Sequence, residues 1–367
     1  MRVLIAAGGT GGHIYPGIAV AKEVLRRDAA SEVKFVGTAR GLEMRLVPQA
    51  GFELLLIEST GLVNMGLMAK LRGLGLIPKS MLEARRLISE FKPDVVVGAG
   101  GYVSGPVLLT AALMRVPTLV MESNAVPGFT NRRLVRFVDK AAVSFEAALP
   151  YFRGKGVVTG NPIRREFFDV PVKERDAARV SLLIFGGSQG ARAINEAMIA
   201  ALPHLKRERS ALSVKHQTGE ADFEKVREGY LKAEWAENAD VMRYIDDMVN
   251  AFATSDLIIS RAGATTAAEM MAAGRAGIMV PLPGQMEQRR NAEAMQTAGA
   301  GRMILQEDLT GERLAAEIAH FVAAPEEITQ MERASRKLAR GDAAAATVDL
   351  IEKLIEQKSG ARSQKSE

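Results

Sequence analysis

Gly8-Gly9-Thr10-Gly11-Gly12-His13 follows an apolar run at residues 3–7, and Gly186-Gly187-Ser188-Gln189-Gly190 follows a second apolar run at residues 182–185. Each glycine-rich stretch precedes a segment with the apolar spacing of an amphipathic helix. A parallel strand that leads through a glycine turn into a helix directs backbone N–H groups and the helix N-terminus toward an anion. Two such stretches predict two α/β halves with a phosphorylated ligand between them.

Strand and helix patterns alternate along the chain, which predicts an α/β protein with two doubly wound, Rossmann-like parallel sheets. The expected strands lie at residues 3–7, 33–36, 54–57, 95–98, 118–121, 140–143 and 157–158, then at 182–185, 213–217, 241–244, 257–260, 277–280 and 301–305. We place the two domains at residues 1–162 and 163–340, followed by a helix at 341–357 and a flexible tail at 358–367.

The composition narrows the class of protein. At 367 residues the chain exceeds one comfortable hydrophobic core, and 47% apolar with 25% charged residues is ordinary for a globular protein. No cysteine is present, which excludes disulfides and thiolate sites. The net charge of +5 suits phosphorylated ligands or an anionic membrane. Nucleic acid is the least favoured ligand, because the basic residues are dispersed and only 5% of residues are aromatic.

The glycine turns also disfavour NAD and ATP as ligands. A dinucleotide fingerprint needs a third glycine where Ile14 stands and an acid after the second strand, which instead ends in Gly37-Thr38. Neither turn closes with the Gly-Lys-Ser/Thr of a phosphate-binding loop of NTPases. For a single glycine-rich stretch, the simpler explanation is that its glycines only permit a tight turn. That explanation is weaker for two stretches at matching places in the two halves.

A third glycine-rich loop, with Gly100, Gly101, Tyr102 and Ser104, also follows an expected strand. It is denser in glycine than a turn requires, so either a large ligand approaches its backbone or it is a surface loop that ends at Pro106.

Together these motifs resemble the MurG-type N-acetylglucosaminyltransferases of bacterial cell-wall synthesis. The resemblance covers nearly the whole chain and rests on the three glycine loops and on residues 160–164, 216–219, 244–248 and 260–269. It implies a GT-B fold, in which an N-terminal acceptor domain and a C-terminal UDP-GlcNAc domain face a cleft and the last helix returns to the N-terminal domain. It implies an inverting transfer of GlcNAc from UDP-GlcNAc to the MurNAc C4 hydroxyl of lipid I, giving lipid II, with no cofactor and no metal.

The resemblance also implies places and partners. The enzyme would lie at the cytoplasmic face of the bacterial membrane as a peripheral protein, near proteins of cell-wall synthesis and division. The resemblance assigns binding of the UDP-GlcNAc donor to the following residues: Thr10, Gly11, Gly12, Asn124, Arg164, Ser188, Ile245, Glu269, Gln288 and Asn291. In that assignment Glu269 binds the ribose hydroxyls, the Ile245 backbone reads uracil, and Gln288 with Asn291 contacts the sugar. For Glu269, a place in the first turn of a helix is the structural alternative.

His13 is the candidate general base, because it is the one histidine of four that stands in a glycine turn and its ordinary pKa lies near neutral pH. The alternative is a histidine that bonds the loop backbone and positions the substrate. The leaving diphosphate is expected at the N–H groups of Gly186, Gly187, Gln189 and Gly190, with the Ser188 hydroxyl assisting. Asp246-Asp247 is expected to cap a helix, and His216 could line the cleft.

Three positions depart from the common pattern of the family: Met121, Ser123 and Glu287. Met121 and Ser123 stand where the family often has a histidine and a glutamine, so any role of those two residues is lost or moved. Glu287 weakens the expectation of sugar contacts near Gln288, while the rest of the constellation is present.

Apolar and basic residues mingle between residues 62 and 92, which predicts a surface that binds an anionic membrane. The residues that we assign to this surface are Leu67, Lys70, Leu71, Arg72, Leu74, Leu76 and Lys79. The alternative is a loop folded into the core, and glycines at positions 66, 73 and 75 argue against a continuous helix.

Two other functions fit parts of the pattern. A non-hydrolysing UDP-GlcNAc 2-epimerase would share the fold but would leave the Gly100 loop and the basic apolar segment unexplained. A non-catalytic UDP-sugar-binding subunit would not need both halves.

We predict that replacing Lys70, Arg72 and Lys79 with Glu reduces binding to anionic vesicles, because each lost cation weakens attraction to the surface by about 1 kcal/mol. Vesicle co-sedimentation measures this, and binding equal to that of the unaltered protein would contradict a membrane surface in this segment.

Overall fold

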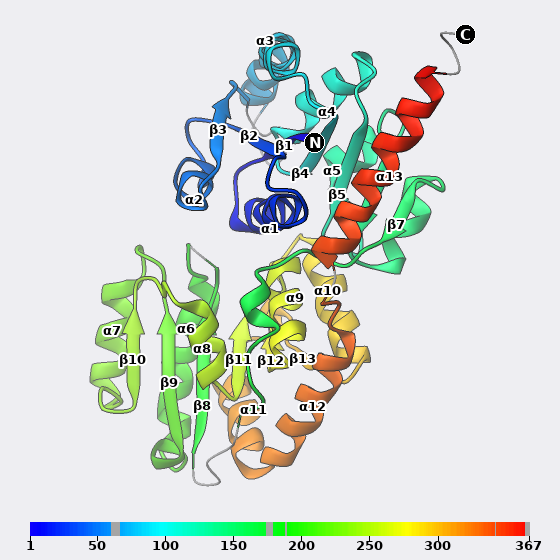
Figure 1. Ribbon diagram of the computed structural model, residues 1–367. Coiled ribbons are helices and arrows are strands. Elements are labelled where there is room, and N and C mark those ends of the chain that lie inside the picture. Colours follow the sequence, from blue (N-terminus) through cyan, green and yellow to red (C-terminus); the bar gives the residue numbers. More distant parts are fainter. Residues whose placement is uncertain (60–66, 174–178, 188, 342, 364–367) are drawn as a thin grey trace. The chain divides into compact units, whose positions relative to one another are not determined.

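The computed structural model describes residues 1–59, 67–173, 179–187, 189–341 and 343–363, and it forms two compact units (Figure 1). The first unit holds Met1–Arg164 together with the C-terminal helix α13 (Ala343–Ser363), and the second holds Arg165–Gly341. This division does not say what each unit binds, which stays a prediction.

The first unit is built on a seven-stranded parallel sheet with the strand order β3-β2-β1-β4-β5-β6-β7. Its strands are β1 (Arg2–Ala7), β2 (Glu32–Gly37), β3 (Glu53–Leu56), β4 (Val95–Gly100), β5 (Thr118–Glu122), β6 (Lys140–Val143) and β7 (Gly156–Val158). Its larger helices are α1 (Gly11–Arg27), α2 (Glu43–Gln49), α3 (Leu67–Phe91), α4 (Ser104–Leu113) and α5 (Phe129–Leu134).

Alternate residues of β1 face opposite sides of this sheet, as the strand period of two requires. Val3 and Ile5 pack in the cluster that contains side chains of α1, α2 and α13. Leu4 and Ala6 pack in the other cluster, with side chains of α3, α4 and α5. The helices therefore cover both faces, and β1, buried on both, is continuously apolar, as is typical of parallel strands.

The second unit has a six-stranded parallel sheet with the order β10-β9-β8-β11-β12-β13. Its strands are β8 (Val180–Phe185), β9 (Leu212–Gln217), β10 (Ala239–Met242), β11 (Leu257–Ser260), β12 (Ala276–Met279) and β13 (Gly301–Met303). Its helices are α6 (Arg192–Ala201), α7 (Phe223–Lys232), α8 (Met248–Thr254), α9 (Ala264–Ala273), α10 (Met286–Thr297), α11 (Gly311–Ala323) and α12 (Pro325–Leu338). The prediction of two Rossmann-like parallel sheets is confirmed.

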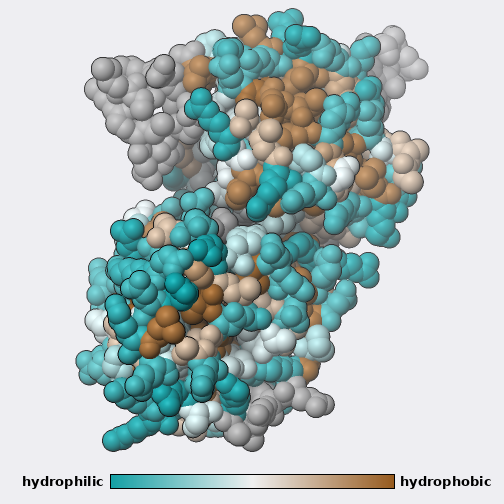
Figure 2. Space-filling view, turned by 90° about the vertical axis from the view of Figure 1, so that its left-hand side faces the viewer, coloured by the Kyte–Doolittle hydropathy of each residue, from teal (hydrophilic) through white to brown (hydrophobic). Residues whose placement is uncertain are grey.

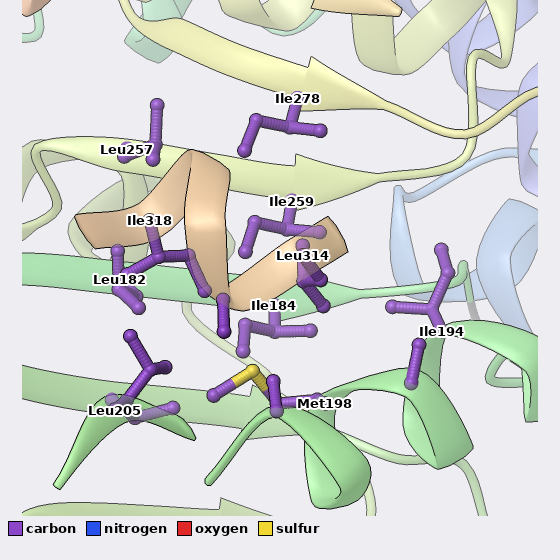
Figure 3. Close-up of a cluster of buried hydrophobic side chains, with 14 of the residues drawn as sticks. Leu182, Ile184, Ile194, Met198, Leu205, Leu257, Ile259, Ile278, Leu314 and Ile318 are labelled. Carbon is purple, nitrogen blue, oxygen red and sulfur yellow. The ribbon is translucent and has the colours of Figure 1, made fainter. Parts of the chain in front are cut away.

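Figure 3 shows how one face of this second sheet is packed. Ile184 of β8 and Ile259 of β11 lie against Met198 of α6 and Ile318 of α11, and all four are wholly buried. The core is therefore a continuous layer between the central strands and two helices that lie far apart in the sequence.

Two local expectations were wrong. The predicted strand at 241–244 lies two residues earlier, because the turn after β9 bonds to its end through Thr218 N and the Met242 carbonyl, and Tyr244 is already at the surface. The glycines at 73 and 75 do not interrupt α3, which runs unbroken from Leu67 to Phe91. α3 also contacts α4, and packing of a helix face outweighs the propensity of single glycines.

The surface of the first unit carries apolar side chains among hydrophilic ones (Figure 2). Met44 in α2 and Leu56 in β3 are each 46% exposed, and β3 is an edge strand of the first sheet. Among the described residues, no helix is both long enough and apolar enough to cross a membrane.

Replacing Ile184 with Ala should lower the free energy of unfolding of the second unit by about 2–5 kcal/mol, because it leaves a cavity in the packed layer. Urea unfolding followed by the fluorescence of Trp235, the single tryptophan of the chain, measures this. Val172→Ala is the matched control, since Val172 is 72% exposed, and it should change stability by less than about 0.5 kcal/mol. Equal effects of the two substitutions would contradict this packing.

Candidate active site

The first glycine turn lies where the strand order of the first sheet reverses, between β1 and β4. Gly101, with φ +80°, packs its Cα against the Gly8 carbonyl so closely that any Cβ would collide with that oxygen. The turn after β1 and the loop after β4 thus fit together only because Gly101 has no side chain. Ligands of doubly wound sheets bind at this reversal point.

His13 lies in the first turn of α1, and its Nδ1 is 3.2 Å from the Gly8 carbonyl oxygen. Because a carbonyl only accepts, Nδ1 carries the proton of this bond, and in the neutral ring Nε2 holds the lone pair. The ring also packs on Gly100, where a Cβ would stand 2.8 Å from the His13 Cγ. The fold therefore fixes both the tautomer and the place of the imidazole.

Burial lowers the pKa of His13 below 6.5, and this outweighs the Gly8 bond and the negative charge of Glu43, which both raise it. The ring is therefore neutral near pH 7 and able to accept a proton at Nε2. This is the state that a general base needs.

Glu43 is a residue of this site that the sequence analysis missed. Its wholly buried carboxylate accepts hydrogen bonds from Gly9 N–H at 3.0 Å and from Thr38 N–H at 3.0 Å and Oγ1–H at 2.9 Å. It holds the glycine turn from behind, at the start of α2. The signal in the sequence is an acid shortly after Gly37 and Gly41, whose missing side chains leave room for the carboxylate.

A cavity of about 530 Å³ opens beside His13 within the first unit. Gly100, Gly101 and Tyr102 line it, as the predicted acceptor loop should. Ser104 does not: it is wholly buried, and its hydroxyl bonds to Gly100 N–H and lies 2.9 Å from the Ala6 carbonyl. Ser104 therefore holds the loop instead of facing a ligand.

Glu122, at the end of β5, also lines the cavity and was not singled out from the sequence. Its carboxylate accepts from the backbone N–H and the amide of Asn124, from Gly128 N–H at 3.1 Å and from the Asn131 amide at 2.9 Å. Burial raises the pKa of Glu122 against the opposing effect of these bonds. It orders the loop between β5 and α5.

The donor residues predicted in the first part of the chain lie at the same strand ends. Thr10 is the exposed N-cap of α1, where its side chain makes no capping bond, and Gly11 and Gly12 begin the helix. Asn124 lines the cavity. The Arg164 guanidinium stacks over the Tyr15 ring, 5.0 Å from its centroid, so its charge is held against the protein and is not freely solvated.

Two of the departures from the family pattern also lie at these strand ends. Met121 is buried and lines the cavity, and Ser123 donates a hydrogen bond of 3.0 Å to the amide oxygen of Asn161. The third, Glu287, stands in the first turn of α10, where an acid suits the helix dipole.

The second glycine turn has the same construction as the first. Gly190 packs on the Thr218 carbonyl and Gly219 on the Gln189 carbonyl, both with positive φ and with no room for a Cβ. Gly190 N–H donates to the Gly187 carbonyl at 3.0 Å within the turn, and the diphosphate contact expected at Gly190 stays a prediction. Ser188 lies outside the described residues.

Gln217 joins this turn to the loop after β10. Its amide N–H donates to the Gly187 carbonyl at 2.9 Å, and its amide oxygen accepts from Ile245 N–H at 2.8 Å. The Ile245 N–H is thereby used within the protein, and the carbonyl is the backbone group left to read a base. Gln217 was part of a family motif in the sequence, but its spacing gave no sign of this bridge.

Glu269 is buried, 7% exposed, at the sixth position of α9. The alternative of an acid in the first helical turn is therefore wrong. Gln288, on α10, accepts from Leu282 N–H at 3.0 Å. Asn291 is wholly buried and donates to the Ala262 carbonyl at 3.1 Å, behind the turn before α9, and its contact with the sugar stays a prediction.

The remaining histidines have other roles. His216 is wholly buried between Tyr230 and Asn195, and burial lowers its pKa to about 3. The suggestion that His216 could line the cleft is therefore wrong. His204 and His320 are at the surface. Asp247 caps α8 through Asn250 N–H at 3.0 Å, which confirms its predicted capping role.

Known proteins are similar in sequence to this chain over nearly its full length. Residues 3–143 match the glycosyltransferase family 28 N-terminal domain, and residues 181–350 match the family's C-terminal domain. A relative from Anaeromyxobacter sp. (strain Fw109-5) is 46% identical over 98% of this chain and 95% of its own length. One from Myxococcus xanthus (strain DK1622) is 44% identical over 97% of this chain and 94% of its own. Both are named UDP-N-acetylglucosamine--N-acetylmuramyl-(pentapeptide) pyrophosphoryl-undecaprenol N-acetylglucosamine transferase.

Solved structures agree with this. The crystal structure of Acinetobacter baumannii MurG matches with a TM-score of 0.76 and 33% identity, over 96% of this chain and 99% of that one. The UDP-GlcNAc 2-epimerase from Neisseria meningitidis, bound to UDP-GlcNAc, matches with a TM-score of 0.70 over 96% and 100%, but its 16% identity shows a shared fold alone.

The fold and the family domains define a glycosyltransferase of the GT-B fold. The chain belongs to the MurG-type enzymes of glycosyltransferase family 28.

Replacing Glu43 with Gln should lower the pKa of His13 further, because the carboxylate's negative charge favours the imidazolium form. An NMR titration of the four histidines measures this. Glu32→Gln, an exposed acid at the start of β2, is the matched control and should leave the value unchanged. A rise in the pKa of His13 in the Glu43 variant would contradict a charged carboxylate close to the ring.

Proposed function

We propose that this protein transfers GlcNAc from UDP-GlcNAc to the C4 hydroxyl of MurNAc in undecaprenyl-diphosphate-linked MurNAc-pentapeptide, converting lipid I to lipid II in peptidoglycan synthesis. The relatives that carry this activity in their names match almost the whole chain. The observation that carries the catalytic proposal is the neutral imidazole of His13 beside a cavity of about 530 Å³.

His13 is the proposed general base. Transfer from an α-linked donor to a β-linked product inverts the anomeric carbon, so a single displacement suffices. The acceptor oxygen bonds to C1 of GlcNAc as the bond from C1 to the UDP oxygen breaks. His13 Nε2 takes the hydroxyl proton, the imidazolium is held through Nδ1–H by the Gly8 carbonyl, and UDP leaves as the anion.

The second unit supplies the proposed donor site. Backbone N–H groups of Gly186, Gly187 and Gln189 and the N-terminus of α6 would stabilise the leaving diphosphate. The Ile245 carbonyl would accept from uracil, while Gln217 keeps the Ile245 loop and the glycine turn in register. Glu269 would accept hydrogen bonds from the ribose hydroxyls. A buried carboxylate needs such donors, because burial without hydrogen bonds is costly.

We place the enzyme at the cytoplasmic face of the membrane as a peripheral protein. Leu82 in α3 is 69% exposed, Leu113 in α4 is 66% exposed, and the Arg86 side chain is 80% exposed. Exposed apolar and basic side chains of this kind suit binding to the interface of an anionic membrane. Lys79, assigned to that surface, pairs with Glu58 at 2.7 Å. Leu76 instead lines the cavity. The side chains of Leu67, Lys70, Leu71, Arg72 and Leu74 lie outside the described part of the chain.

Proteins of cell-wall synthesis and division are proposed as partners on the basis of the family resemblance. Co-purification from cells whose membrane proteins have been crosslinked would test this separately from the activity.

The direct test is transfer of radiolabelled GlcNAc from UDP-GlcNAc to a lipid I analogue, with a control that lacks the acceptor. Label in the lipid product is the expected result. UDP-ManNAc in the control without transfer would assign a 2-epimerase instead. Neither product from folded protein would leave a non-catalytic UDP-sugar-binding subunit.

His13→Ala should lower kcat by about 10²–10⁴-fold, because a positioned base contributes a factor of this size. For the unaltered enzyme, kcat/KM should fall as the pH drops through the lowered pKa of His13, below 6.5, since the protonated ring cannot act as a base. The surface variant His204→Ala is the matched control and should keep both properties. An unchanged acidic limb in His13→Ala would assign the base to another group.

A further inference from the structure

Both polar and apolar groups line the cavity beside His13. Polar groups follow three strand ends: His13 after β1, the loop from Gly100 after β4, and Glu122 to Asn124 after β5. Ser80 of α3 and Thr130 and Asn131 of α5 add polar side chains from the helices. Apart from Ala99 of β4 and Met121 of β5, the apolar side chains come from three helices. They are Leu76 and Ile77 of α3, Pro106 and Leu109 of α4, and Phe129 and Leu134 of α5.

The origin of these helices explains why the apolar lining is continuous. α3, α4 and α5 all pack on the same face of the first sheet, where their inner side chains share one hydrophobic cluster. α4 contacts both α3 and α5. The helices therefore form a wall that rises from the strand ends, where the catalytic groups lie, along one face of the unit.

A cation lies on this wall. Arg133 of α5 lines the cavity, and its guanidinium is 5.2 Å from the centroid of the Phe129 ring. Phe129 is itself 50% exposed, so the apolar lining reaches the surface of the unit.

The kinds of group that line the cavity match the kinds of group in the acceptor, and the inference rests on the proposed function in this respect. In that acceptor a sugar is followed by a diphosphate and then by a polyprenyl chain. A sugar with its hydroxyl at His13 places the diphosphate, and after it the prenyl chain, farther along the cavity. Arg133 has the charge for the diphosphate, and the helix wall has the apolar surface for the chain.

We propose that the wall formed by α3, α4 and α5 is a binding subsite for the first isoprene units of the acceptor lipid. The enzyme thus recognises the lipid itself, in addition to any contact between its outer surface and the membrane. Burial of isoprene carbons against Leu109 and its neighbours stabilises the acceptor complex by the transfer of apolar surface from water.

The test uses two water-soluble acceptor analogues with the same sugar, peptide and diphosphate, one ending in two isoprene units and the other in a methyl group. Without vesicles or detergent, the unaltered enzyme should show a KM for the prenyl analogue about tenfold or more below that for the methyl analogue, with similar kcat, because a few buried methylenes are worth this factor. Equal KM values would overturn the subsite.

Leu109→Asn should raise the KM for the prenyl analogue about tenfold, because it places an amide in the apolar wall, and should leave the KM for the methyl analogue and for UDP-GlcNAc unchanged. Leu231→Asn in α7 is the matched control, since Leu231 is 52% exposed and does not line the cavity. It should change none of the three values. Ile77→Asn on α3 repeats the test if Leu109→Asn fails to fold.

A Leu109→Asn enzyme that loses affinity equally for both analogues would also overturn the proposal, since the residue would then act on the sugar or on the fold. Absence of transfer to either analogue by the unaltered enzyme would instead contradict the proposed function. The two failures are therefore distinct.

Discussion

Both halves of this protein depend on backbone packed against glycine where no Cβ would fit. In the first unit the Gly8 carbonyl lies against Gly101, and in the second the carbonyls of Thr218 and Gln189 lie against Gly190 and Gly219. Each contact brings the turn after the first strand of a sheet against a loop that follows a neighbouring strand. Backbone amides and helix N-termini are thereby gathered at the carboxyl ends of the strands, which is the property that a diphosphate-linked substrate requires.

The same constraint prepares the proposed base. Gly100 leaves room for the His13 ring, the Gly8 carbonyl fixes the proton on Nδ1, and the buried Glu43 carboxylate holds the turn that carries both. None of these groups has to move for Nε2 to accept a proton. In the second unit Gln217 has the corresponding task, because one side chain bonds both the glycine turn and the loop that contains Ile245.

Most of the fold could be predicted from the sequence, because parallel strands buried on both faces leave continuous apolar runs and glycine turns mark their ends. Contacts between distant residues could not. Glu43 reads as an ordinary acid at the start of a helix until its bond to Gly9 is seen. His216 ends a strand but is buried by Tyr230 and Asn195, which come from other elements. Asn291 shares a helix face with Gln288 but is covered by the turn at Ala262. In each case tertiary packing decided a role that local spacing left open.

The proposed mechanism requires the acceptor hydroxyl to bind at His13 in the cavity of the first unit. A crystal structure of the protein with UDP and a soluble lipid I analogue would test this. We expect the MurNAc C4 oxygen within hydrogen-bond distance of His13 Nε2, about 2.6–3.2 Å, with the diphosphate toward Arg133. A C4 oxygen bound to Glu122, or an acceptor outside this cavity, would contradict it.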